Sequence, residues 1–196
     1  MISLYFSKLL LQPQQAQDRY ALHLAVSTAF TGRDLDPTIN RVLWRLANRQ
    51  MLLVQSEKVP DWAHMLEQRF LACPVEVKQE GIRLHSGQRF HFLLDGNPVY
   101  RHEGKATAIM DQDGQLSWLK RQFEHSGLRL VDSAVTGYQL LHLPKKANRN
   151  LVTVLCCHYA GVLEVNHVEW ALDGLRKGIG RAKFAGLGLL DIYPVR

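Results

Sequence analysis

Apolar spacing in the first half of the chain predicts a strand, a helix, two strands, a helix and a strand, in that order. Apolar and polar residues alternate over residues 2–11, which is typical of a half-buried strand. From Asp18 to about Phe30, apolar residues recur at the spacing of one helix face. The apolar stripe of this helix consists of Leu22, Ala25, Val26 and Ala29. Strands are also predicted over 39–47, 50–56 and 75–78. A second helix is predicted to begin at Pro60, to end at Cys73-Pro74 and to bury Leu66.

The second half of the chain repeats this order of elements. A strand is predicted over residues 89–99, with Phe90, Phe92 and Leu94 on one face. Ser117 is predicted to cap a helix that Gly127 ends. The remaining elements are long strands over 128–143 and 151–165, a helix capped by Asn166, and a final strand over 189–195.

Two consecutive βαββαβ patterns predict an α+β protein built from two tandem ferredoxin-like domains. A chain of 196 residues suits two small domains, and a hydrophobic content of 46% is enough for a real core. We expect an N-terminal domain over residues 1–80 and a C-terminal domain over residues 89–196. The first would carry the Asp18 helix, and the second would carry a glycine-rich loop.

The glycine-rich loop lies between the last predicted helix and the last predicted strand. Its glycines are Gly178, Gly180, Gly186 and Gly188, and its cations are Arg181 and Lys183. Glycine allows positive φ and a close approach of ligand to backbone, and the two cations favour an anion. A glycine-terminated helix that turns tightly into a strand explains the loop as well. The order helix, loop, strand excludes a dinucleotide-binding fingerprint, which follows a strand and opens a helix.

Composition favours a polyanionic partner and argues against a metal centre. The chain has 24 Lys and Arg against 18 Asp and Glu, a net charge of +6. The cysteines Cys73, Cys156 and Cys157 form no CxxC pair, so neither a disulfide framework nor a zinc site is expected. The histidines show neither HxxxH nor HExxH spacing, and we predict no metal and no cofactor.

The chain shows no signal for a membrane or for export. No apolar run approaches the length of a membrane span. The apolar N-terminal residues are interrupted by Ser7-Lys8 and lack the apolar core and cleavage site of a signal peptide. We therefore expect a cytoplasmic protein without a membrane partner.

Tyr20 and His23 are the candidate catalytic residues. They lie three positions apart on the first predicted helix and so share a face beside its apolar stripe. A histidine can take a proton from a ribose 2′-hydroxyl or give one to a leaving 5′-oxygen. A phenol can orient the attacking group or stabilise the phosphorane. The alternative is a partly exposed helix histidine beside an aromatic residue, because such pairs are common.

Three segments of the chain stand out together: the stretch G-x-G-x-A-K-x-x-G-x-G-L-L at residues 178–190, Tyr20-Ala21-Leu22-His23, and Gly96-Asn97-Pro98 with the preceding Phe90 and Phe92. They resemble the RAMP superfamily of CRISPR-associated proteins, and within it the CasE-type repeat endoribonuclease. The resemblance runs almost from end to end. It sets Tyr20 and His23 at the positions of the catalytic tyrosine and histidine of the family.

The resemblance implies metal-independent cleavage of CRISPR precursor RNA at the 3′ base of the repeat stem-loop. Attack by the 2′-hydroxyl would leave a 2′,3′-cyclic phosphate on one product and a 5′-hydroxyl on the other. The resemblance also implies that the protein stays bound to the product hairpin and contacts other subunits of a Cascade-type surveillance complex.

The developing charge of the phosphorane requires a fixed cation. The candidates are Lys145, Lys146 and Arg149, in the turn between the two long strands, where similar enzymes carry a basic residue. We assign Lys146 to catalysis and the other two to RNA binding, although a solvated basic turn explains all three.

RNA hairpins are recognised by shape, phosphates and 2′-hydroxyls. The further RNA-binding candidates are Arg19, Ser27, Arg101, Lys105, Lys120, Arg121, Arg181 and Lys183. Lys120-Arg121 also fits an ordinary surface helix. Two alternatives to an enzyme stay open: an RNA-hairpin-binding subunit in which His23 is idle, and an RRM-like protein, although the RNP1 signature is missing.

Overall fold

The computed structural model describes residues 1–15, 18–30, 42–144 and 151–195. By its internal packing the chain divides into two compact units. Unit 1 contains Met1–Arg83 and Phe184–Gly186, and unit 2 contains Leu84–Lys183 and Leu187–Arg196. The domain boundaries that we predicted at residues 80 and 89 stay a prediction. None of the helices in the described part of the chain has the length and apolarity needed to cross a membrane.

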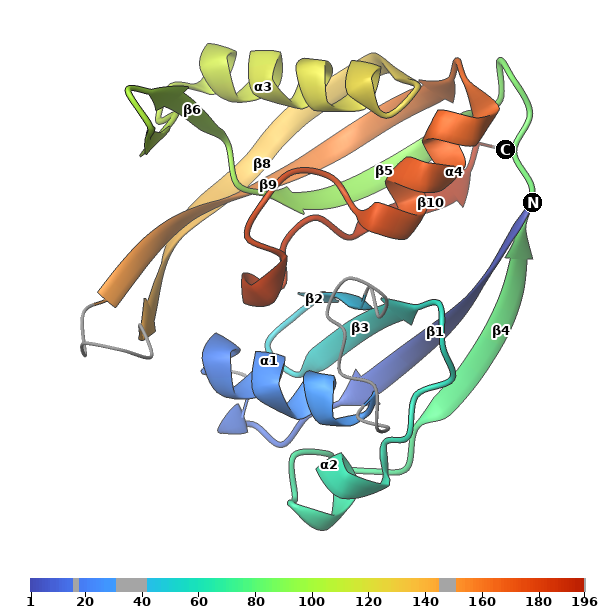
Figure 1. The fold of residues 1–196 in the computed structure, drawn as a ribbon, viewed down its shortest axis with the longest axis vertical. Helices are drawn as coiled ribbons and strands as arrows, with labels where there is room; N and C mark the ends of the chain where they lie inside the picture. Colours follow the sequence, from blue (N-terminus) through green and yellow to red (C-terminus); the bar gives the residue numbers. More distant parts are fainter. Residues whose placement is uncertain (16–17, 31–41, 145–150, 196) are drawn as a thin grey trace. The chain divides into compact units, whose positions relative to one another are not determined.

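Unit 1 is a four-stranded antiparallel sheet with two helices. Its elements are β1 (Ile2–Leu10), α1 (Arg19–Thr28), β2 (Val42–Leu46), β3 (Met51–Ser56), α2 (Ala63–Glu67) and β4 (Glu76–Ile82) (Figure 1). The strands lie in the order β2-β3-β1-β4. One cluster of buried side chains joins both helices to the sheet, including Leu22 of α1, Met65 of α2 and Leu52 of β3.

Helix α1 begins where the sequence predicts it. The Asp18 side chain accepts hydrogen bonds from the backbone N–H groups of Tyr20 and Ala21, at 2.9 Å each, which satisfies two otherwise unpaired donors. The predicted stripe of Leu22, Ala25, Val26 and Ala29 is buried in the core of unit 1. Capping and periodicity are both local signals, and here they agree.

Helix α2 is shorter than predicted. It ends at Glu67, and Arg69 adopts a φ of +56°, so the chain leaves the helix well before Cys73-Pro74. Leu66, which was predicted to face inward, is 41% exposed. The following strand, β4, runs on to Ile82 instead of ending near residue 78.

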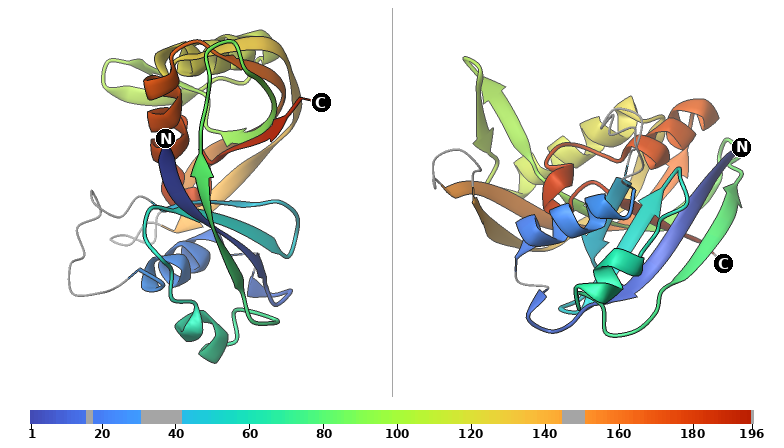
Figure 2. Two further views of the ribbon diagram at one scale, coloured as in Figure 1. Left: turned by 90° about the vertical axis from the view of Figure 1, so that its right-hand side faces the viewer. Right: turned by 60° about the horizontal axis from the view of Figure 1, so that its bottom comes forward.

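Unit 2 contains a second four-stranded antiparallel sheet. Its elements are β5 (Arg89–Gly96), β6 (Val99–His102), β7 (Lys105–Ala108), α3 (Gln112–His125), β8 (Leu128–Pro144), β9 (Leu151–Val165), α4 (Val168–Lys177) and β10 (Leu190–Pro194). The short 3-10 helix η2 (Lys183–Ala185) has its last two residues in unit 1. The sheet order is β10-β5-β9-β8, and β8 and β9 form a long curved ribbon (Figure 2). Phe123 of α3 packs edge-to-face on Phe92 of β5, with ring centroids 5.0 Å apart.

Both sheets have the same topology. Leaving aside the β6–β7 hairpin, each places its first strand between its last and its third, with its second strand at the edge. This is the arrangement expected of a βαββαβ unit. The predicted fold class, two ferredoxin-like units of the α+β type, is confirmed.

Three local predictions in unit 2 are wrong. The strand predicted over 89–99 is interrupted at Asn97-Pro98, and an unpredicted β6–β7 hairpin follows. Helix α3 begins at Gln112, because Asp111 rather than Ser117 caps it and accepts the N–H of Gly114 at 2.6 Å. Helix α4 has His167, not Asn166, as its N-cap residue. The N–H groups of both residues donate to the carbonyl of Gly127, which delays the start of the helix.

Candidate active site

Helix α1 presents His23 against the glycine-rich loop. The His23 imidazole is half-buried and lies edge-on to the ring of Phe184, with centroids 6.3 Å apart and an interplanar angle of 72°. Phe184 belongs to the short segment of the glycine-rich loop that packs into unit 1. The structure therefore brings together two of the segments that carried the family resemblance.

The Tyr20 hydroxyl group is buried and has no hydrogen-bond partner among the residues that the structure describes. A buried polar group without a partner costs about 1–3 kcal/mol, so such a group is commonly satisfied by a ligand or by water. Tyr20 lies in the first turn of α1, on the helix that carries His23.

Arg19 and Ser27 flank these two residues and form hydrogen bonds inside unit 1. Arg19 is only 8% exposed, and its Nη1 donates to the carbonyl oxygen of Ala185 at 2.8 Å. Ser27 Oγ donates to the carbonyl oxygen of His23 at 2.7 Å, a side-chain-to-backbone bond within helix α1. Direct RNA binding by either residue stays a prediction. Their observed contacts fix α1 and join it to the glycine-rich loop.

The four glycines of the loop all adopt positive φ, from +72° at Gly178 to +90° at Gly188. The two ends of the loop are joined, because Ile179 N–H donates to the Gly188 carbonyl at 2.8 Å. Lys183 Nζ donates to the carbonyl oxygen of Gly180 at 2.6 Å, so this ammonium group helps to close the loop. Arg181 is exposed.

The loop packs most tightly at Gly186. A Cβ atom at this position would lie 2.3 Å from Cζ3 of Trp44, a buried residue of β2. Gly186 thus meets two requirements that only glycine satisfies together, a positive φ and the absence of a side chain.

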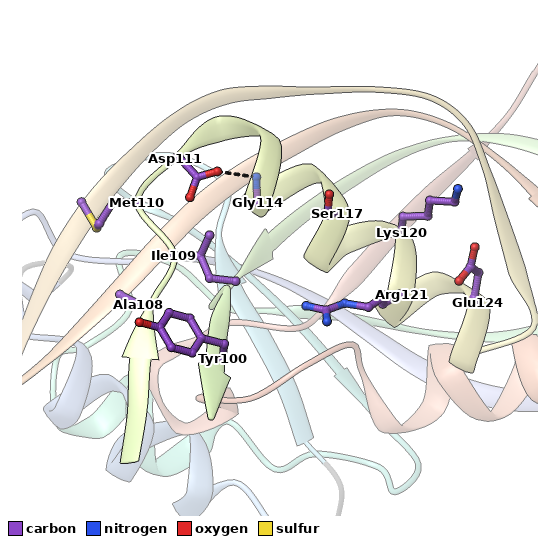
Figure 3. A pocket seen from close by; sticks show the side chains of 10 residues that line it. All are labelled: Tyr100, Ala108, Ile109, Met110, Asp111, Gly114, Ser117, Lys120, Arg121 and Glu124. Carbon is purple, nitrogen blue, oxygen red and sulfur yellow. Dashed lines mark hydrogen bonds between the residues drawn. The ribbon is translucent and has the colours of Figure 1, made fainter. Parts of the chain in front are cut away.

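Unit 2 carries a groove whose charged lining residues are Lys120 and Arg121 together with Asp111 and Glu124. Its volume is about 710 Å³, and α3 and the β6–β7 hairpin contribute to its walls (Figure 3). Lys120 and Arg121 come from α3 and Tyr100 from β6, and Figure 3 shows Arg121 extending toward the hairpin side. Arg101 and Lys105 are exposed on the same hairpin. Four of the predicted RNA-binding cations therefore belong to these two neighbouring elements.

The β6–β7 hairpin is part of the candidate RNA-binding surface, and no strand pair was predicted at its position. Glu103 and Gly104 form its turn with φ values of +49° and +78°. A two-residue turn with both φ values positive is a preferred hairpin connection, and its strong sequence signals are Asn-Gly, Asp-Gly and Gly-Gly. Glu103-Gly104 supplies only the glycine, which is a weak signal for the hairpin and for Tyr100.

Two groups of predicted residues need separate mention. Lys145, Lys146 and Arg149, including the predicted catalytic cation, lie outside the described residues. Within the described part of the chain, Asp95, Cys156 and His158 of unit 2 place a carboxylate oxygen, a thiol sulfur and a ring nitrogen within 4.8 Å of one another. These three could hold a metal ion, although motif spacing did not indicate one.

The chain is similar to known CRISPR-associated proteins. The family described as "CRISPR associated protein" matches residues 4–194. The CRISPR-associated endoribonuclease Cse3 of Thermus thermophilus is 30% identical, over 97% of this chain and 100% of the relative. The CasE subunit of the Escherichia coli CRISPR system Cascade is 23% identical, over 98% of this chain and its own full length.

Solved structures give the same grouping. Thermus thermophilus Cse3 bound to an RNA representing a pre-cleavage complex has a TM-score of 0.87 and 30% identity, over 98% of this chain and 100% of that one. A structure of Cse3 bound to a 19-nucleotide RNA has a TM-score of 0.88 and 32% identity, over 99% of this chain and 100% of that one. The predicted resemblance is confirmed, and the chain belongs to the CRISPR-associated protein family, among the CasE-type endoribonucleases.

Proposed function

We propose that this protein is a metal-independent endoribonuclease that cuts CRISPR precursor RNA at the 3′ base of the repeat stem-loop. The observation that carries the proposal is the similarity, over 98% of the chain, to Cse3 bound to a pre-cleavage RNA. The arrangement of α1 supports it, because this helix contacts the glycine-rich loop and carries a half-buried imidazole and a phenol that has no hydrogen-bond partner within the described part of the chain.

In the proposed reaction, a ribose 2′-hydroxyl attacks the adjacent phosphorus and the 5′-oxygen leaves. His23 takes the 2′-hydroxyl proton or supplies one to the leaving oxygen, and the Tyr20 hydroxyl donates a hydrogen bond to the reacting group. The products carry a 2′,3′-cyclic phosphate and a 5′-hydroxyl. Lys146 is the proposed cation that balances the charge of the phosphorane.

The surroundings of His23 support its role. A general acid or base must be held within hydrogen-bond reach of the proton that it moves. The ring of Phe184 lies edge-to-face with the imidazole. The Arg19 guanidinium donates a hydrogen bond to the carbonyl oxygen of Ala185, the residue after Phe184. We infer that the loop segment Phe184–Gly186 acts as a positioning element for His23.

For substrate binding we propose the groove of unit 2 and its hairpin. Lys120, Arg121, Arg101 and Lys105 offer charges for phosphates, and the exposed Tyr100 offers a ring face. After cleavage, the protein keeps the product stem-loop and joins a Cascade-type complex in the cytoplasm. CasE of Escherichia coli is a subunit of such a complex.

The decisive experiment compares wild type with His23→Ala on a labelled cognate repeat hairpin in excess EDTA, with both product ends mapped. We expect one cut at the 3′ base of the stem with a cyclic phosphate end. The variant should lose at least about 100-fold in cleavage rate, the usual contribution of a general acid or base, while hairpin binding is retained.

His64→Ala is the matched control, because His64 is an exposed helix histidine of the same unit. This control should cleave like wild type. Binding without any cut by wild type would indicate an RNA-hairpin-binding subunit instead of an enzyme. Unchanged cleavage by His23→Ala would remove His23 from the mechanism.

A further inference from the structure

Three potential metal ligands of unit 2 meet on one face of the β5–β9 strand pair. Asp95 and His158 are direct cross-strand partners in the antiparallel register. Cys156 lies two positions before His158 on β9, so their side chains point to the same face of the sheet. Strands hold their side chains in fixed directions, which favours a preformed site.

The environment of this cluster differs from that of an exposed polar group. The Asp95 side chain is 7% exposed and Cys156 is fully buried, whereas the His158 side chain is 37% exposed. His158 Nδ1 lies 2.6 Å from Asp95 Oδ1. The cluster therefore has a closed side, formed by a carboxylate and a thiol, and an open side at the imidazole.

We propose that Asp95, Cys156 and His158 form a Zn²⁺ site with a fourth position open to water beside His158. Thiolate, imidazole and carboxylate are the three ligand types that Zn²⁺ uses in proteins. One ligand of each type with one open position gives the four-coordinate tetrahedral arrangement that this ion prefers. A site of purely oxygen ligands would favour Mg²⁺ or Ca²⁺ instead, and this one contains sulfur and nitrogen.

The distances require only small side-chain movements. Bonds of about 2.0–2.3 Å to a tetrahedral Zn²⁺ place neighbouring ligand atoms roughly 3.3–3.8 Å apart. The His158–Asp95 pair at 2.6 Å would open by about 1 Å as the ion enters, and the sulfur, which lies within 4.8 Å of both, would have to approach by no more than about 1.5 Å. Binding releases the Cys156 thiol proton to solvent, and the hydrogen between Nδ1 and Oδ1 moves to Nε2 or to solvent.

The site would stabilise unit 2 where the glycine-rich loop joins the sheet. The carbonyl oxygen of Asp95 accepts the N–H of Gly188 at 2.7 Å, which ties the end of the loop to β5. An ion that clamps β5 to β9 at Asp95 therefore also supports this attachment. His23 and Tyr20 belong to unit 1, so the proposed ion takes no part in their chemistry and does not rest on the proposed function.

The test is a titration of the metal-free full-length protein with Co²⁺ and, separately, with Zn²⁺. We expect one equivalent of Co²⁺ to give a near-ultraviolet thiolate-to-cobalt charge-transfer band and the visible bands of tetrahedral cobalt, both displaced by Zn²⁺. Excess Zn²⁺ should raise the unfolding temperature, because a ligand that binds only the folded state stabilises it.

Cys156→Ser should abolish the charge-transfer band. Asp95→Asn should weaken Zn²⁺ binding by at least about tenfold, because even the loss of a residue that only hydrogen-bonds to a metal ligand typically lowers metal affinity about 10–100-fold. Cys73→Ser, which removes an exposed thiol, is the matched control and should behave like wild type.

The wild-type spectrum alone can overturn the proposal, whether or not a variant folds. No saturable binding, or binding without a thiolate band, would show that the His158–Asp95 hydrogen bond joins the strands without a metal. A thiolate band that persists in Cys156→Ser and disappears in Cys73→Ser would assign the ion to adventitious surface binding. RNA cleavage in EDTA decides the proposed function separately.

Discussion

Gly186 shows how strictly a single position of the glycine-rich loop is determined. Its φ of +75° is a conformation that other residues rarely adopt, and the Trp44 ring fills the space where a side chain would project. The neighbouring Phe184 and Ala185 contact His23 and Arg19. Any displacement of Gly186 would therefore be transmitted to the face of α1 that carries the candidate catalytic residues.

We predict that Gly186→Ala destabilises the protein more than Gly104→Ala does. Both positions have positive φ, which costs a non-glycine residue about 1–2 kcal/mol, but a Cβ at Gly104 meets no atom within 4 Å. The clash at Gly186 should add about 1–3 kcal/mol of overpacking. Urea unfolding of both variants gives the comparison, and equal losses would show that Trp44 moves aside freely.

The features of the candidate site that the sequence predicts are the local ones. Tyr20 and His23 could be assigned to one helix face because the Asp18 cap and the apolar stripe fix where α1 begins and which side it buries. The contact of His23 with Phe184 joins residues far apart in the chain, and no spacing rule predicts it. The same limit applies to Asp95, which only strand pairing brings to Cys156 and His158.

At the scale of elements, one carboxylate connects three neighbouring strands of the unit 2 sheet. Glu164 on β9 accepts hydrogen bonds from Arg129 Nη2 on β8 and from Arg89 Nε on β5, each at 2.8 Å. The hydrogen bonds from Arg129 and then from Arg89 lower the pKa of Glu164 below its ordinary value of 4.5. These two arginines are thus less available to an RNA phosphate than the cations of α3.

We predict that Glu164→Gln lowers the unfolding temperature modestly at pH 7 and that the difference shrinks as the pH falls. A depressed folded-state pKa contributes stability above the unfolded-state pKa, and this contribution is lost as the pH falls through the folded-state pKa. The loss should therefore set in below about pH 4.5. Thermal unfolding across this range measures it, with Glu80→Gln as the control. A difference independent of pH would mean that packing, not charge, is lost.

The fold was predictable from element patterns, whereas individual boundaries depended on tertiary contacts. Alternation and helical periodicity were enough to indicate both βαββαβ units. The predicted strand over 89–99 failed because Asn97 turns its side-chain amide to the Leu155 carbonyl, at 2.7 Å, and the chain leaves the sheet there. Helix α2 ends early because the backbone adopts a positive φ at Arg69. Since this residue is not a glycine, the sequence gives no signal for the end of the helix.

For the whole molecule, a net charge of +6 matters less than the positions at which exposed cations gather. Lys120 and Arg121 line one groove of unit 2, and Arg101 and Lys105 lie on the adjoining hairpin. Arg89 and Arg129 are engaged with Glu164. Under the proposed function, binding of an RNA hairpin should depend on the first set of cations more than on the second.

We predict that Arg121→Gln weakens repeat-hairpin binding and lowers the salt dependence of the affinity. Loss of one phosphate contact should reduce the slope of log K against log salt by about 1. Arg89→Gln is the matched control and should leave the slope nearly unchanged. The test is to measure the affinity of wild type and both variants between about 50 and 200 mM salt, because affinities that depend on phosphate contacts fall steeply over this range. Equal slopes for all three proteins would place the RNA elsewhere.

Because Phe184–Gly186 belongs to unit 1, this unit cannot complete its folding until late in translation. A nascent chain emerges from its N-terminus, so Met1–Arg83 is free to fold first. Arg19 finds the carbonyl of Ala185, and Trp44 finds Gly186, only after translation has passed through unit 2 as far as Lys183. The helix that carries His23 therefore receives its last supports late in synthesis, and an incomplete chain would hold its candidate catalytic residues in an unfinished setting.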